Sequence, residues 1–454
     1  MTRRLVRFLD ERSGSAPLVR RALRYVFPDH WSFLLGEIAL YSFVVLVGTG
    51  IFVTLFFEPS LKDTVYRGDY EPLRGLKMSE AYRSVVEMSF TVKAGLLMRQ
   101  THHWAADVFV VAIVLHVSRV LFTGAFRKPR DLVFYVGVVM VMIALLEGFL
   151  GYSLVDDLLS GMGLAIAYSV AMSIPFFGAN LALLVWGAPF PGEPAFESRM
   201  YIFHVLIFPL ALALLIGLHL LLLATRHHTQ FPGPGRSERA AVGLPAVPSY
   251  APRSIGLAFA VAAVLFLLGG LVQINPIWQW GPYELAQGTN GAQPDWYLGW
   301  LIGGLRLMPG FDITVGDYTL VPNAFWGGAA FPLVVFLILF LWPTIERRVT
   351  GDRGFHHLLD RPRDRPWRTA TVSAFISWVA VVFLAGSADR IYVLFSIPYE
   401  TLIWIFRVLV LLLPVIVFFL VKRLCVELQV SETYELRRKA LEEGAPAVPA
   451  GLDR

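Results

Sequence analysis

The chain has 454 residues, of which 56% are hydrophobic and 16% are charged, with a net charge of +5 and one cysteine. Average soluble proteins carry about 25% charged residues, whereas apolar runs long enough to cross a bilayer recur along this chain. We therefore predict a polytopic membrane protein and exclude a soluble enzyme, a disordered chain and a disulfide scaffold. Cys425 alone cannot hold a cysteine-ligated Fe–S cluster or a two-thioether c-type haem. The basic residues set membrane orientation, so we expect the lipid bilayer and no nucleic acid as a partner.

The apolar runs predict an all-α fold with eight transmembrane helices. In chain order they span residues 32–57, 102–122, 132–155, 200–224, 254–273, 325–345, 371–391 and 397–421. A short turn around Ser387–Pro398 separates the last two. Two long loops poor in basic residues, 156–198 and 274–324, are expected to fold back at the membrane surface, with short helices near 160–173 and 295–308.

Basic residues cluster in alternate segments, which predicts that both termini lie in the cytoplasm. The expected organisation is an Arg-rich N-terminal segment (1–31), a four-helix bundle (32–224), a cytoplasmic linker (225–253), a second domain with the other four helices (254–424) and a cytoplasmic tail (425–454).

Four histidines lie within predicted transmembrane helices, in two pairs. His102 and His116 are 14 residues apart on the second helix, and His204 and His219 are 15 apart on the fourth. These spacings return the side chain to within about 40° and 60° of its starting direction and separate the pair by about 21–22 Å along the helix axis. Because both helices run in the same direction, His102 is level with His204 and His116 with His219.

Facing imidazoles at two depths are what two bis-histidine haems require. A single buried histidine is as often a polar residue bonded to a neighbouring helix, but two level pairs disfavour that interpretation. The ligands of a compact metal site would instead cluster at one depth. His103 is interpreted as a polar neighbour of His102 and not as a ligand.

Arginines and glycines near the histidines support a haem bundle. Guanidinium groups near helix ends either reach toward lipid headgroups or pair with haem propionates; the candidates are Arg99, Arg119 and Arg199. Glycines in membrane helices usually permit close packing, but here they repeat the 14-residue histidine spacing, as Gly36 and Gly50 on the first helix and Gly137 and Gly151 on the third. Such notches would let two flat macrocycles approach the helix backbones.

With the outer-loop motif Pro294-Asp295-Trp296-Tyr297, these features resemble the cytochrome b subunit of cytochrome bc complexes, the quinol:cytochrome c oxidoreductases. The resemblance runs from about Trp31 to Val421 and includes Arg306. Asp295 replaces the glutamate common in the family, and the 15-residue spacing on the fourth helix is similar to cytochrome b6. The continuous chain and stretches such as Leu96–Ala106 resemble the actinobacterial form. Val155 stands where other members have proline. Because a proline there would end the third helix rigidly, we expect its loss to alter the shape of the outer quinol pocket.

The resemblance implies two non-covalent b-type haems, an outer one held by His102 and His204 and an inner one held by His116 and His219. It further implies a Q cycle, with quinol oxidised at an outer site and quinone reduced at an inner site. The implied partners are a separate Rieske iron–sulfur subunit and a cytochrome c subunit, either c1-like or di-haem. A terminal oxidase is a further candidate, and the family forms homodimers of complexes. The actinobacterial resemblance favours menaquinol.

Asp295 is the candidate proton acceptor from quinol, and we expect burial to raise its pKa; the alternative is that it caps the helix that follows. Tyr297 is a second candidate quinol contact. Two other functions stay open: a di-haem membrane anchor of another quinone-reactive oxidoreductase, and a transporter that uses the histidines as proton relays.

Overall fold

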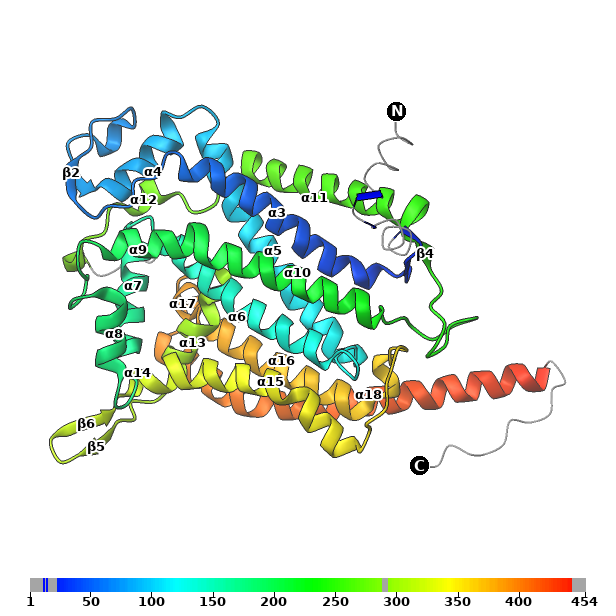
Figure 1. Cartoon of the computed structure of the whole chain (residues 1–454). Helices are drawn as coiled ribbons and strands as arrows, with labels where there is room; N and C mark the ends of the chain where they lie inside the picture. The colour runs from blue at the N-terminus through cyan, green and yellow to red at the C-terminus, as the bar shows by residue number, and fades with distance from the viewer. Residues whose placement is uncertain (1–10, 13, 15–22, 288–292, 443–454) are drawn as a thin grey trace.

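The computed structural model describes residues 11–12, 14, 23–287 and 293–442, and it is almost entirely helical. Within these residues eight helices are long and apolar enough to cross a membrane, as predicted. They are α3 (Leu34–Thr54), α5 (Gly95–Thr123), α6 (Asp131–Ser153), α9–α10 (Phe196–Ile202 and Phe208–Arg226), α11 (Ala251–Leu271), α15 (Phe331–Thr350), α16 (Pro366–Ala385) and α18 (Tyr399–Glu442). Figure 1 shows these helices side by side along one direction, with α18 extending beyond the others.

The bundle has two ends, which we name by their residues. The Arg-rich face holds the segments 124–130, 227–250 and 351–365. The loop-rich face holds the segments 55–94, 154–195, 272–287, 293–322 and 386–398. Its short elements are β2 (Asp63–Val65), β3 (Lys77–Ser79), α4 (Glu80–Phe90), α7 (Leu158–Met172), α8 (Gly178–Trp186), α12 (Ile277–Trp280), α13 (Gly299–Leu307) and the hairpin of β5 (Ile313–Val315) with β6 (Tyr318–Val321).

Helix packing joins the first and second halves of the chain. Helix α3 packs on α5, α6 packs on α10, and α11 from the second half packs on both α3 and α5. Helix α16 packs on α18 and on α13, the helix that follows the Pro294–Tyr297 motif. At the Arg-rich face a short strand near the N-terminus, β1 (Val26–Phe27), pairs with β4 (Leu244–Pro245). The second half therefore packs directly on α5, one of the two helices that carry the histidines.

The fourth transmembrane helix contains a π-helical turn at Phe203–Ile207, between α9 and α10. A π turn accommodates one more residue than an α-helical turn and is frequent at functional sites. His204 is the second residue of this turn, and the rest of the turn leads toward His219, so the turn absorbs the extra residue of their 15-residue spacing. The side chains of His204 and His219 therefore lie on one face of their helix, as those of His102 and His116, 14 residues apart, do on α5.

Helix α6 ends at Ser153, two residues before Val155. Asp156 adopts a positive φ of 55°, which turns the chain out of the helix. Asp157 then caps α7, because its side chain accepts from the Ser160 N–H while its own N–H donates to the Ser160 hydroxyl. The left-handed backbone of Asp156 and the cap made by Asp157 thus connect α6 to α7, the predicted surface helix.

The segment between the last two membrane helices is not a simple turn. It contains α17 (Ala388–Phe395), whose Asp389 accepts hydrogen bonds from Arg306 on α13 at 2.9 and 3.1 Å. The predicted short turn around Ser387–Pro398 was therefore wrong. The hydrogen bonds between Asp389 and Arg306 attach α17 to α13, the helix that follows the Pro294–Tyr297 motif.

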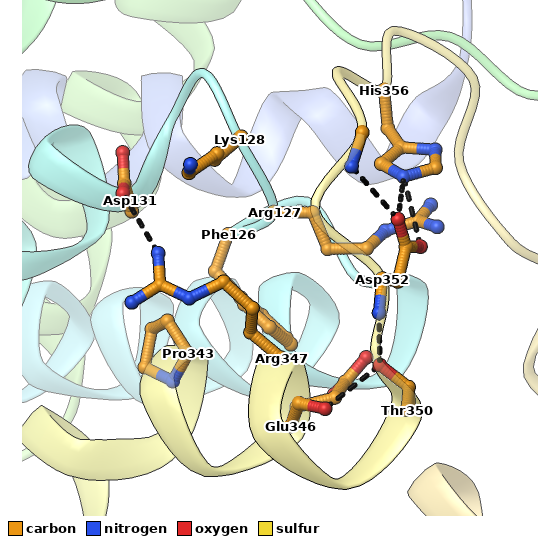
Figure 2. A pocket seen from close by; sticks show the side chains of 11 residues that line it. Phe126, Arg127, Lys128, Asp131, Pro343, Glu346, Arg347, Thr350, Asp352 and His356 are labelled. Carbon is orange, nitrogen blue, oxygen red and sulfur yellow. Dashed lines mark hydrogen bonds and ion pairs between the residues drawn. The ribbon is translucent and has the colours of Figure 1, made fainter.

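Charged side chains at the Arg-rich face form a buried ion network. Arg368 on α16 pairs with Glu346 on α15 and, at 2.6 Å, with Asp360, which also pairs with Arg127 at 3.1 Å. A pocket lies beside this network, and Figure 2 shows Arg347 pointing toward Asp131 across it. These contacts tie the loop after α5 to the ends of α15 and α16.

Candidate functional site

The four membrane histidines meet in pairs at two levels of the bundle. The ring centroids of His102 and His204 lie 6.3 Å apart, nearly perpendicular, on the side of the loop-rich face. His116 and His219, one repeat closer to the Arg-rich face, are near enough to interact electrostatically. The structure thus brings together the pairs that the helical spacing predicted.

Each of the four predicted glycines faces one of these histidines. A Cβ atom built on Gly50 or Gly151 would lie 3.2 Å from His102 or 2.4 Å from His204. The matching distances are 3.4 Å from Gly36 to His116 and 3.7 Å from Gly137 to His219. The glycines therefore leave room for the imidazoles at both levels, as well as for close helix packing.

The outer and inner imidazoles differ in their polar partners. His102 Nδ1 lies 3.1 Å from the Leu46 carbonyl and 3.0 Å from the Thr49 hydroxyl. His204 Nδ1 lies 2.9 Å from the Glu147 carboxylate, within ion-pair distance, although the contact does not meet the geometry of a hydrogen bond. Nδ1 of His116 and of His219 has no hydrogen-bond partner of normal geometry among the described residues.

Buried guanidinium groups with free N–H donors lie near both histidine pairs. Arg99 donates to the Asn275 carbonyl, but its Nε has no partner in the described part of the chain. The same holds for Nε and Nη2 of Arg119 and for Nε of Arg130, a residue that the sequence analysis missed. Arg199 instead pairs with Glu193 at the surface. Unpartnered buried donors are costly, so these three arginines suit an anionic group such as a haem propionate.

The residues present therefore fit a haem at each level. Facing imidazoles supply the donor pairs, glycines supply space, and buried arginines supply anion partners. Searched within the described ranges, the chain has no cluster of three or more histidine, cysteine or acidic side chains that would form a compact metal site.

The motif residues Asp295 and Tyr297 lie against the second and third membrane helices. Asp295 Oδ1 is 2.7 Å from Nε2 of His103, and the Tyr297 hydroxyl donates to Asp295 Oδ2 at 3.0 Å. Tyr297 is almost completely buried against Gly148 on α6, where a Cβ atom would lie 2.7 Å from its hydroxyl. His103 is thus a satisfied polar neighbour of His102, as predicted, and its partner is Asp295.

The expected pKa of Asp295 was wrong in direction. Burial alone would raise its pKa, but the charge of His103 and the hydrogen bonds from His103 and Tyr297 outweigh burial, so the pKa lies below its ordinary value. Burial and the adjacent Asp295 carboxylate raise the pKa of Tyr297, so its phenol remains a donor. The Asp295 side chain makes no capping hydrogen bond to the short helix at Trp296–Leu298, so the alternative prediction that Asp295 caps this helix was wrong.

Two further carboxylates lie on the loop between α6 and α7. Burial raises the pKa of Asp156 to about 7 and that of Asp157 to about 6. The segment is joined to the motif loop because the Tyr283 N–H donates to the Asp156 carbonyl and the Leu158 N–H donates to the Gly281 carbonyl. The two long loops of the loop-rich face are therefore connected by backbone hydrogen bonds.

A polar network that the sequence analysis missed lies level with the inner histidines. Glu37 on α3 follows Gly36 and accepts hydrogen bonds from Tyr250 at 2.7 Å and from Ser254 at 2.5 Å, both at the start of α11. Tyr41 donates to the same carboxylate at 3.3 Å. An acidic residue in the first turn of a membrane helix was the available signal.

Comparisons with known proteins settle the family. A family described as cytochrome b (N-terminal)/b6/petB matches residues 107–282. The cytochrome bc1 complex cytochrome b subunit of Mycobacterium leprae is 44% identical over 437 residues, covering 96% of this chain and 78% of the relative. This chain belongs to the cytochrome bc1 complex cytochrome b family. The anchor-subunit and transporter interpretations are thereby set aside.

Other relatives agree with this cytochrome b assignment. The cytochrome bc1 complex cytochrome b subunit of Streptomyces coelicolor is 43% identical over 427 residues, covering 94% of this chain and 78% of the relative. A solved chain described as hyperthermophilic respiratory Complex III shares the fold, with a TM-score of 0.67 and 21% identity over 92% of this chain and 99% of that one.

Proposed function

We propose that this cytochrome b oxidises quinol near the loop-rich face and reduces quinone near the Arg-rich face, moving electrons across the membrane between them. The observation that carries the proposal is the pair of histidine levels, each faced by two glycines. His102 and His204 would hold an outer b-type haem, and His116 and His219 an inner one. A bound haem iron supplies reversible one-electron transfer.

Quinol oxidation requires a base and a hydrogen-bond donor, and Asp295 and Tyr297 supply them. Since the pKa of Asp295 is lowered by His103, its carboxylate is ionised and ready to accept a proton or hydrogen bond from a quinol hydroxyl. Asp156 titrates at about 7 on the adjoining loop, so it can exchange protons with water near neutrality. We infer that protons leave the quinol by way of this group of carboxylates.

Quinone reduction at the opposite side requires proton donors. The Glu37 network provides a carboxyl group and three hydroxyls between α3 and α11, level with His116. We infer that this network lines the inner quinone site and delivers protons to it.

The complex would supply the other electron carriers. We propose a separate Rieske iron–sulfur subunit and a cytochrome c subunit as partners in a quinol:cytochrome c oxidoreductase of the translocase class, dimeric, with menaquinol as the quinol. Orientation follows the basic residues, so the Arg-rich face and both termini lie in the bacterial cytoplasm.

A reduced-minus-oxidised spectrum of the purified complex tests the proposal. We expect two b-type signals in the natural protein, with His102→Ala and His116→Ala each removing a different one. Absence of b-type haem, or loss of both signals together in both variants, would contradict the assignment.

A further inference from the structure

Glu147 is a carboxylate inside membrane helix α6 whose role the proposed electron path does not explain. Its side chain is 15% exposed, and its Oε2 has no partner among the described residues. Ionisable groups at bilayer depth are costly and therefore mark functional positions. Glu147 precedes Gly148, which accommodates Tyr297, and lies one helical turn before Gly151, which accommodates His204.

The carboxylate stands where a partner for a ligating imidazole is expected. Its Oε1 lies 2.9 Å from Nδ1 of His204. A histidine that binds a metal nearly always donates its second ring N–H to a carboxylate or carbonyl, which fixes the tautomer, holds the ring and makes the ligand more electron-rich. A proton on Nδ1 facing Glu147 leaves Nε2 of His204 free to bind iron.

The inner level offers a comparison within the same helix. Gly137 and Gly151 are 14 residues apart, and 14 residues before Glu147 stands Val133. Val133 is aliphatic, and among the described residues the acceptor near His219 is the backbone of Val133. On α6 the two levels thus share their glycines but differ in the charge at this matching position.

We propose that Glu147 is a positioning residue that fixes His204 and lowers the reduction potential of the outer haem relative to the inner one. The inference rests on the proposed function, which assigns a haem to His102 and His204. A negative charge beside an axial ligand stabilises the more positive, oxidised iron. Electrons that enter near the loop-rich face then move toward the higher potential near the Arg-rich face.

Redox titration of the purified complex, followed by visible and EPR spectra, tests this role. Glu147→Gln keeps an acceptor beside His204 but removes the charge. We expect the reduction potential of the outer haem to rise by about 59 mV, which for a one-electron couple corresponds to a tenfold change in the ratio of oxidised to reduced haem. The inner haem keeps its potential. Glu58→Gln, which removes an exposed charge at the loop-rich face, leaves both potentials unchanged.

Each outcome bears on a separate statement. An unchanged outer potential in Glu147→Gln, or an equal shift of both haems, overturns the role of Glu147 and leaves the haem assignment intact. Absence of the outer haem from the natural protein contradicts the proposed function itself. If Glu147→Gln fails to retain the outer haem, Glu147→Asp decides. If Glu147→Asp retains the outer haem at or below its natural reduction potential, the proposal is supported. If Glu147→Asp raises that potential or loses the outer haem, the proposal is overturned.

Discussion

His103 Nε2 lies 2.7 Å from Asp295 Oδ1, although the two residues are 192 positions apart in the chain. The contact joins the residue after a candidate haem ligand to the candidate base for quinol oxidation. It therefore connects the two halves of the proposed reaction through one polar pair.

Replacing His103 should change the pH dependence of quinol oxidation. His103→Gln keeps an N–H donor near Asp295 but removes the charge that holds the pKa of this carboxyl below its ordinary value. The pKa of Asp295 then rises. Because only the ionised carboxylate accepts a proton, activity is lost at a higher pH as the medium is acidified.

The pH profile of quinol:cytochrome c reduction by the purified complex measures this change. His356→Gln is a matched control, since His356 also pairs with an aspartate, Asp352, but at the Arg-rich face. The control should keep the natural profile. An acid limb that stays in place in His103→Gln would show that His103 does not set the ionisation of Asp295.

Alanine at Gly151 should disturb the outer haem more than alanine at Gly137 disturbs the inner one. The added methyl group at Gly151 would lie 2.4 Å from His204, whereas the one at Gly137 would lie 3.7 Å from His219, which is ordinary contact. Overpacking of this kind costs about 1–3 kcal/mol. We expect Gly151→Ala to lose most of the outer b signal and Gly137→Ala to keep both, as measured by haem content and difference spectra.

The buried ion network should be far more important for stability than a surface pair. The side chains of Arg368 and Glu346 are 6% and 11% exposed, so Arg368→Met leaves the Glu346 carboxylate without its partner at a cost of about 3–5 kcal/mol. Arg361→Met breaks an exposed pair with Glu432 and should cost less than about 1 kcal/mol. Thermal unfolding in detergent compares them; equal losses would contradict the network's role.

Glu37→Gln should slow quinone reduction. The amide would turn an N–H₂ group toward hydroxyls that donate to the carboxylate, and it cannot release a proton. We expect a roughly tenfold or greater loss in electron transfer through the inner site, measured as haem reduction by quinol with the outer site inhibited. Glu427→Gln, on an exposed pair of α18, serves as control. An unaffected rate in Glu37→Gln would remove this network from the inner site.

The parts that could be predicted from the sequence depend on local periodicity. The eight spans, the two histidine levels and the matching glycine spacing all follow from 3.6 residues per turn and from bilayer thickness. The surface helix at Leu158–Met172 was predicted near 160–173, and its cap by Asp157 and Ser160 is equally local.

The remaining site features depend on which helices touch, and periodicity does not contain that information. The partners of Asp295 and Glu37 come from distant helices, so the lowered pKa of Asp295 could not be derived from burial alone. In the sequence, the π turn at Phe203–Ile207 is indicated only indirectly, by the 15-residue spacing of His204 and His219. The partner of His204, Glu147, became visible only when α6 was placed beside the fourth membrane helix.

The division of the site between the two halves of the chain also orders its assembly in time. All four candidate haem ligands lie before residue 220, whereas Asp295 and Tyr297 follow some 75 residues later. A nascent chain therefore presents both histidine pairs to the membrane before it has Asp295 or Tyr297, the proposed contacts of quinol. If haem is inserted at that stage, a half-made subunit would carry electron acceptors before this quinol site is complete.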